Sequence, residues 1–125
     1  MAVEVEVANR SGVAVDEQAA ADAVRRVLDT EGIAEGEVGV AFVGADEARR
    51  LKQEHLGVGE TPDVLAFPID GREELPGGVP RQLGDVVVCP DVVGKDWRDA
   101  LVHGVLHLLG YDHGPEMAER EASAR

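Results

Sequence analysis

Hydrophobic and polar residues follow two different rhythms along the chain, one typical of strands and one typical of helices. Residues 3–7 read Val-Glu-Val-Glu-Val, and this strict alternation predicts a strand with one buried face. Asp16 is suited to cap a helix that continues to about Thr30, where apolar residues recur at helical spacing. The same reasoning predicts a second helix and three further strands, at residues 45–56 and at residues 38–43, 64–67 and 83–89.

The most apolar helix is predicted at about residues 96–109, and its hydrophobic residues cover most of its circumference. A helix with this pattern is buried on nearly all sides. The stripe that stays polar consists of Asp96, Asp99, His103 and His107. We therefore expect this helix to be the central helix of the fold, with its polar stripe carrying the chemistry.

The remaining segments complete the predicted fold. The strand at residues 83–89 is the most apolar one, so it is expected in the middle of the sheet. Residues 70–82 hold two prolines and three glycines and are predicted as a loop, and residues 90–94 are predicted as a connector. A short polar helix is expected at residues 115–123. Helices and strands mixed around one sheet indicate an α+β fold, with residues 1–125 forming a single domain.

The chain is strongly acidic, with a formal net charge of −13 from 25 acidic and 12 basic residues. Taken alone, this charge argues against nucleic-acid binding, because contacts with phosphates need Lys and Arg. Arg49, Arg50 and Lys52 lie close together in the sequence. They are either ordinary charges of a solvated helix face or part of a local basic surface. No DNA partner is expected.

Other features of the composition predict a cytoplasmic protein. The single cysteine, Cys89, excludes an internal disulfide and fits a reducing compartment. No run approaches the ~18–20 apolar residues of a membrane helix, so no membrane partner is expected. The N-terminal segment is acidic and alternating, unlike a signal peptide.

Three of the four histidines fall within one short stretch, His103-Gly-Val-Leu-His107-Leu-Leu-Gly110-Tyr-Asp-His113. His103 and His107 lie one helical turn apart, so their side chains project from the same face. A continuing helix would carry His113 ~9 Å beyond His107. Gly110 can instead adopt the left-handed conformation that ends helices and lets the chain turn back. The spacing predicts a three-histidine metal site with an open fourth position, which is typical of catalytic zinc.

Two other kinds of metal site share part of this pattern. A structural zinc would need a fourth ligand, for which Cys89 is the candidate. The histidine spacing also matches the H-E-x-x-H-x-x-G-x-x-H pattern of metzincin peptidases. Gly104 stands where those enzymes carry the glutamate that accepts a proton, so a peptidase is the weaker interpretation.

The histidine stretch closely resembles the H-G-x-L-H-L-x-G-Y-D-H signature of the YbeY family of bacterial endoribonucleases and rRNA maturation factors. Residues 63–68 and 83–88 resemble two further family segments, in the same order. The resemblance implies an α+β fold with a four-stranded sheet and one metal ion, usually zinc, bound by His103, His107 and His113. It also implies a role in ribosome maturation and quality control, notably in processing the 3′ end of 16S rRNA.

The resemblance leaves the catalytic residues open. Family members usually carry an arginine and a lysine shortly before the segment that residues 63–68 resemble. Leu56 and Val58 occupy those positions here. A neighbouring cation is then the candidate for the role of that arginine: Arg49, Arg50 or Lys52.

The resulting hypothesis is metal-assisted hydrolysis of an RNA phosphodiester, with rRNA and the small ribosomal subunit as partners. Asp112 is a candidate for orienting a metal-bound histidine. The alternative hypothesis assigns the protein to a different functional class. In this hypothesis it is an assembly factor that binds the ribosome or a ribosomal protein, and the metal mainly stabilises its fold.

Overall fold

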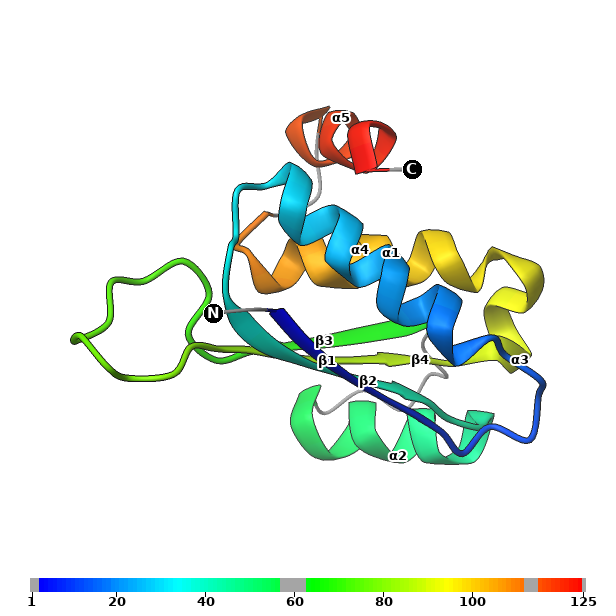
Figure 1. The fold of residues 1–125 in the computed structure, drawn as a ribbon. Coiled ribbons are helices and arrows are strands. Elements are labelled where there is room, and N and C mark those ends of the chain that lie inside the picture. Colours follow the sequence, from blue (N-terminus) through cyan, green and yellow to red (C-terminus); the bar gives the residue numbers. More distant parts are fainter. Residues whose placement is uncertain (1–2, 57–62, 112–114, 125) are drawn as a thin grey trace.

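The computed structural model describes residues 3–56, 63–111 and 115–124, and it has an open four-stranded sheet with helices on both faces (Figure 1). The strands are β1 (Val3–Asn9), β2 (Gly36–Phe42), β3 (Val64–Pro68) and β4 (Gln82–Val88). The helices are α1 (Glu17–Thr30), α2 (Ala45–Leu56), α3 (Pro90–Val93), α4 (Trp97–Leu108) and α5 (Pro115–Ala124), with a 3₁₀ turn at Gly94–Asp96. None of the helices in these ranges is long and apolar enough to cross a membrane.

The strand order in the sheet is β1-β2-β4-β3. β2 pairs in parallel with both β1 and β4, whereas β3 pairs with β4 in the antiparallel direction. β4 therefore lies between two strands, and its residues Leu83, Val86 and Val88 are fully buried. The predicted α+β fold with a mixed four-stranded sheet is confirmed, as is the central place of the most apolar strand.

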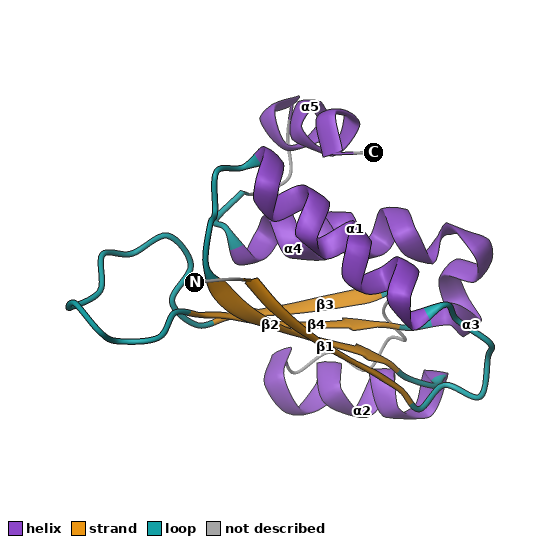
Figure 2. Cartoon of the chain, in the orientation of Figure 1, coloured by secondary structure: helices purple, strands orange, loops and turns teal. Residues whose placement is uncertain are grey.

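The sheet separates two unequal layers of helices (Figures 1 and 2). α1 and α4 cover one face and enclose the larger core, whereas α2 covers part of the other face. The smaller core beneath α2 consists of Val43, Ala48, Leu65, Val87 and Cys89. The larger core draws its fully buried residues from both helices and from the sheet, among them Val24, Leu28, Phe42, Val86, Leu101, Val105 and Leu106.

The start of α1 follows from its sequence. Asp16 adopts an extended backbone conformation, and its Oδ1 accepts a hydrogen bond of 3.0 Å from the Ala19 N–H. This bond satisfies one of the N–H groups that the first helical turn leaves without a partner. The helix then buries its apolar stripe against the sheet, as the spacing predicts.

α4 lies close to the sheet because Gly104 has no side chain. A Cβ atom at this position would lie 2.5 Å from Val86 Cγ1 and 3.1 Å from Val64 Cγ2, closer than packed carbon atoms approach. At the start of the helix, the Trp97 ring packs edge-on against Phe42, with ring centroids 5.3 Å apart. α4 is thus fixed against β4 and β3, and Leu101, Val105 and Leu106 on this helix are fully buried, as the apolar pattern predicts.

The segment between β4 and α4 differs from the predicted connector at residues 90–94. Pro90–Val93 form a short helix, and the 3₁₀ turn leads directly into α4. Pro90 occupies the first turn of α3, where its fixed φ angle suits a helix and its missing N–H costs nothing. Four residues are too few to show a helical period in the sequence, so the pattern gave no signal there.

Candidate metal centre

The end of α4 is a cap that Gly110 makes possible. Gly110 has a φ angle of 97°, in the region that favours glycine. Its N–H donates to the His107 carbonyl oxygen at 3.0 Å, and the Tyr111 N–H donates to the Leu106 carbonyl oxygen at 3.2 Å. These two bonds form a Schellman motif, and the chain turns back after Leu109 as predicted.

His103 and His107, which we call the histidine pair, lie on one side of α4 with their rings in contact. The ring centroids are 4.6 Å apart, with an angle of 83° between the planes. The two Nε2 atoms lie 3.1 Å apart. The spacing of four residues thus brings both imidazoles to one point, as the sequence predicts.

Each ring of the histidine pair is held through its Nδ1 atom. The Nδ1 of His107 lies 2.8 Å from the Tyr111 carbonyl oxygen, and the Nδ1 of His103 lies 3.0 Å from Glu121 Oε1. A carbonyl and a carboxylate accept hydrogen bonds, so we assign the ring proton to Nδ1 in both residues. Each Nε2 then presents a lone pair toward the other ring, and two such lone pairs repel unless a proton or a cation lies between them.

This arrangement of donor atoms fits a metal ion. Two ligands of a tetrahedral zinc, each ~2.1 Å from the metal, lie roughly 3.4 Å apart. The observed 3.1 Å between the Nε2 atoms is close to that separation. A carboxylate or carbonyl on the other ring nitrogen is also the usual partner of a metal-bound histidine.

The structure describes only part of the predicted ligand set. His113 and the candidate Asp112 lie outside the described residues. Within the ranges that are described, no three or more His, Cys, Asp or Glu side chains are grouped to hold a metal. The three-histidine site therefore stays a prediction, of which the structure contains the two residues from α4.

A buried carboxylate is linked to the histidine pair through Tyr111. The Glu31 side chain is 2% exposed, and its Oε1 accepts hydrogen bonds of 2.7 Å from the Tyr111 hydroxyl and from Arg72 Nη2. Its Oε2 is buried without a hydrogen bond from any described residue, and Arg120 Nη1 lies 3.8 Å away. The hydrogen bond to Glu31, followed by burial, raises the pKa of the Tyr111 phenol above its ordinary value of 10.0.

Sequence reasoning missed both acidic residues of this region. In the sequence Glu31 only follows a helix predicted to continue to about Thr30, and Glu121 is only one polar residue of the short helix expected at residues 115–123. One weak signal exists for Glu31. A carboxylate is unfavourable at the C-terminal end of a helix, so an acidic residue there calls for a partner elsewhere in the fold.

The cations considered from the sequence lie on another face of the sheet. Arg49, Arg50 and Lys52 belong to α2, whereas the histidine pair belongs to α4. The two helices lie on opposite faces of the sheet (Figure 1). Arg49 lies 3.8 Å from Asp46, and Arg50 lies 3.9 Å from Glu54. These contacts are ion pairs along the helix surface. The structure therefore does not bring the three cations together with the histidine pair.

The structure does not support the two alternative metal sites, the metzincin peptidase site and the structural zinc site with Cys89. Gly104 faces β4 rather than the histidine pair, and its packing leaves no room for the glutamate of a metzincin. Cys89 is 1% exposed and belongs to the smaller core beneath α2. It is therefore separated by the sheet from the histidines with which it would share a structural zinc.

The chain is similar to one protein family over nearly its whole length. The family model described as endoribonuclease YbeY matches residues 6–125. A relative from Salinispora tropica, described as endoribonuclease YbeY, is 38% identical, and the alignment covers 96% of this chain and 89% of the relative. A relative from Acidothermus cellulolyticus with the same description is 41% identical, over 96% of this chain and 85% of the relative.

A solved structure supports the fold. The solution structure of a protein from Thermotoga maritima matches with a TM-score of 0.64 and 24% identity, covering 96% of this chain and 85% of that one.

The family match confirms the resemblance found in the histidine stretch, and it confirms the prediction of an endoribonuclease over that of a peptidase. This chain belongs to the YbeY family of endoribonucleases.

Proposed function

We propose that the protein is a metal-dependent endoribonuclease that processes the 3′ end of 16S rRNA and acts in ribosome quality control. The observation that carries the metal dependence is the 3.1 Å approach of two Nε2 atoms whose rings are each held through Nδ1. The family supplies the endoribonuclease class. The proposal includes a cytoplasmic location, the small ribosomal subunit as partner and a ribosomal protein as a further candidate partner.

In this proposal His103, His107 and His113 hold one divalent metal, with zinc as the first candidate because three histidines leave an open position. When bound, the metal lowers the pKa of a water molecule and polarises a phosphoryl oxygen of the RNA. Glu121 and the Tyr111 carbonyl orient the rings by accepting the Nδ1 protons. Asp112 remains a candidate for a similar orienting role.

The protein also needs cations near this site to bind RNA, because its net charge is −13. Arg72 and Arg120 have side chains that are 43% and 46% exposed. The Arg120 guanidinium lies 5.9 Å from the centre of the Tyr111 ring, and the carbonyl of Tyr111 contacts His107. We therefore assign phosphate binding to Arg72 and Arg120 rather than to the cations of α2.

A second candidate function is a ribosome-binding assembly factor whose metal mainly holds the fold. Two observations favour it, the acidic charge and the presence of Leu56 where the family usually has an arginine. This candidate predicts that removing the metal disturbs the fold and that the metal-loaded protein does not cleave RNA, so one set of measurements separates the two functions.

The test combines metal analysis with an rRNA cleavage assay on the same purified protein. We expect wild type to carry metal and to cleave, and His107→Ala and His113→Ala to lose both properties. His55→Ala is the matched control, because His55 is an exposed histidine of α2 and should leave both properties unchanged. Full metal content in His107→Ala would overturn the site.

Metal-stripped protein tests the dependence itself. If it stays folded and still cleaves rRNA, metal-dependent catalysis is wrong. If metal-loaded wild type does not cleave RNA but restores rRNA maturation in cells that lack the protein, the assembly factor is the better assignment.

A further inference from the structure

We propose that Glu31 is a positioning residue of the metal centre, which acts through Tyr111 on His107. The inference rests on the proposed function, because it concerns the metal affinity of that site. It assigns a role to a residue that lies far from the histidine stretch in sequence and that nothing in that stretch indicates.

The connection consists of two short hydrogen bonds that meet at Tyr111. The Tyr111 hydroxyl donates to Glu31 Oε1 at 2.7 Å, and the Tyr111 carbonyl oxygen accepts from His107 Nδ1 at 2.8 Å. The Tyr111 N–H is also bonded, to the Leu106 carbonyl in the helix cap. Tyr111 is therefore fixed at its ring and at both polar groups of its main chain. A shift of its ring would move the carbonyl that sets the orientation of His107.

The burial of Glu31 needs an explanation that helix formation does not supply. Its side chain is 2% exposed, although burying a charged carboxylate is costly unless partners compensate for the lost water. The charge also lies at the C-terminal end of α1, where the helix dipole is unfavourable. Arg72 compensates from the loop between β3 and β4, with Nη2 on Glu31 Oε1 and Nη1 on the Glu31 carbonyl oxygen. Glu31 Oε1 thus accepts hydrogen bonds from both Arg72 and Tyr111.

The residues around this carboxylate come from four parts of the chain. We call Glu31, Arg72, Tyr111 and Arg120 the Glu31 cluster, and they belong to the end of α1, the β3–β4 loop, the turn after α4, and α5. Arg120 precedes Glu121, whose carboxylate holds the other ring of the histidine pair. Both imidazoles are thereby linked to the same cluster, one through Tyr111 and one through α5. Loosening the cluster should lower the metal affinity of the site.

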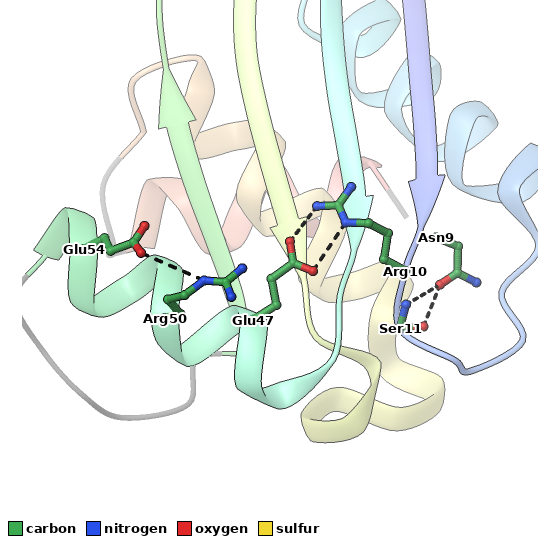
Figure 3. A network of polar contacts seen from close by, with 6 residues as sticks. All are labelled: Asn9, Arg10, Ser11, Glu47, Arg50 and Glu54. Atoms are coloured by element: carbon green, nitrogen blue, oxygen red, sulfur yellow. Dashed lines mark hydrogen bonds and ion pairs between the residues drawn. The ribbon is translucent and has the colours of Figure 1, made fainter.

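A matched control exists on the opposite face of the sheet. Glu47 of α2 and Arg10 form an ion pair with the same shortest distance, 2.7 Å (Figure 3). This pair has no contact with the histidine pair among the interactions of the described residues. Removing it should disturb the fold locally and leave the metal affinity unchanged.

The experiment uses Tyr111→Phe, Glu31→Gln, the double variant and the control Glu47→Gln in the full chain. Affinities for Zn²⁺ and Co²⁺ are measured by competition with a chelator, and the visible spectrum of bound Co²⁺ reports the geometry around the metal. We expect Tyr111→Phe and Glu31→Gln each to weaken metal binding by about tenfold, the usual effect of losing a group that orients a ligand. We expect both to change the Co²⁺ spectrum and the loss in the double variant to be smaller than the two single losses combined, because both changes act on metal binding through the position of Tyr111.

The outcomes distinguish this inference from the proposed function. Wild-type affinity and spectrum in both single variants would overturn the role of Glu31 while leaving the metal site intact. An equal loss of affinity in Glu47→Gln would also overturn it, since the effect would then be general destabilisation. Failure of wild type to bind either metal would overturn the proposed function itself. Thermal unfolding of the metal-free variants checks that each one folds.

Discussion

Two ion pairs of this protein have the same contact distance but different surroundings. Glu31–Arg72 and Glu47–Arg10 each have a nitrogen–oxygen distance of 2.7 Å. The carboxylate side chain is 2% exposed in Glu31 and 25% exposed in Glu47. Water screens the second pair far more than the first, so equal geometry does not mean equal contribution. How much each pair contributes to stability depends on the burial of its carboxylate and on the other partners of that carboxylate.

The two pairs also join different parts of the fold. Glu47 connects α2 to Arg10, directly after β1, and so ties a helix to the sheet face that it covers (Figure 3). Glu31 connects the end of α1 to a loop, to α5 and, through Tyr111, to the histidine pair. The first pair is a local contact of one layer. The second pair connects several elements of the fold with the histidine pair, which is why we assign Glu31 a role in the site.

The largest difference between the two ion pairs is expected in their contributions to the stability of the fold. Glu31→Ala should lower the free energy of unfolding by about 2 kcal/mol, because it removes buried hydrogen bonds to a charged group. Glu47→Ala should lower it by only about 0.5 kcal/mol, as is usual for an exposed ion pair. Urea unfolding of the metal-free proteins measures both values. Equal losses would show that burial does not distinguish the two pairs.

The packing of α4 gives the next largest effect. Gly104→Ala places a methyl group against Val86, whose side chain is fully buried. We expect a net loss of about 1 kcal/mol, since overpacking costs more than the better helix propensity of alanine returns. Gly77→Ala is the control, because nothing lies within 4 Å of a Cβ added there. A Gly104→Ala protein as stable as wild type would mean that α4 is not held at this distance by glycine.

RNA cleavage compares the two faces of the sheet directly. Arg120→Ala should lower kcat/KM by about tenfold, since one charge-assisted hydrogen bond contributes about 1.5 kcal/mol. The triple variant Arg49→Ala, Arg50→Ala, Lys52→Ala should have a smaller effect, although it removes more positive charge. Cleavage rates at several salt concentrations test this, because the loss of a phosphate contact also weakens the salt dependence. A larger loss in the triple variant would return the RNA-binding role to α2.

How much the sequence could predict depends on how local each feature is. The start of α1 at Asp16 and the turn at Gly110 were predictable, because caps involve residues a few positions apart. The convergence of the histidine pair followed from spacing on one helix. The contact between Glu31 and Tyr111 joins residues 80 positions apart, and no periodicity records such a contact. The role of Glu31 was therefore accessible only from the fold.

The smallest effect concerns pH and separates the two pairs once more. The hydrogen bond from Arg10 lowers the pKa of Glu47 below its ordinary value of 4.5. A carboxylate with a lowered pKa in the folded state stabilises the fold above its unfolded pKa, and this contribution disappears as the pH falls through the folded pKa. The stability advantage of wild type over Glu47→Gln should therefore be constant at neutral pH and decline below about pH 4.5. Urea unfolding of both proteins across the acid range measures an advantage of about 0.5 kcal/mol, small because Arg10 is half exposed. If the advantage instead persists at the most acidic pH, the contact with Arg10 stabilises the fold through packing rather than through charge.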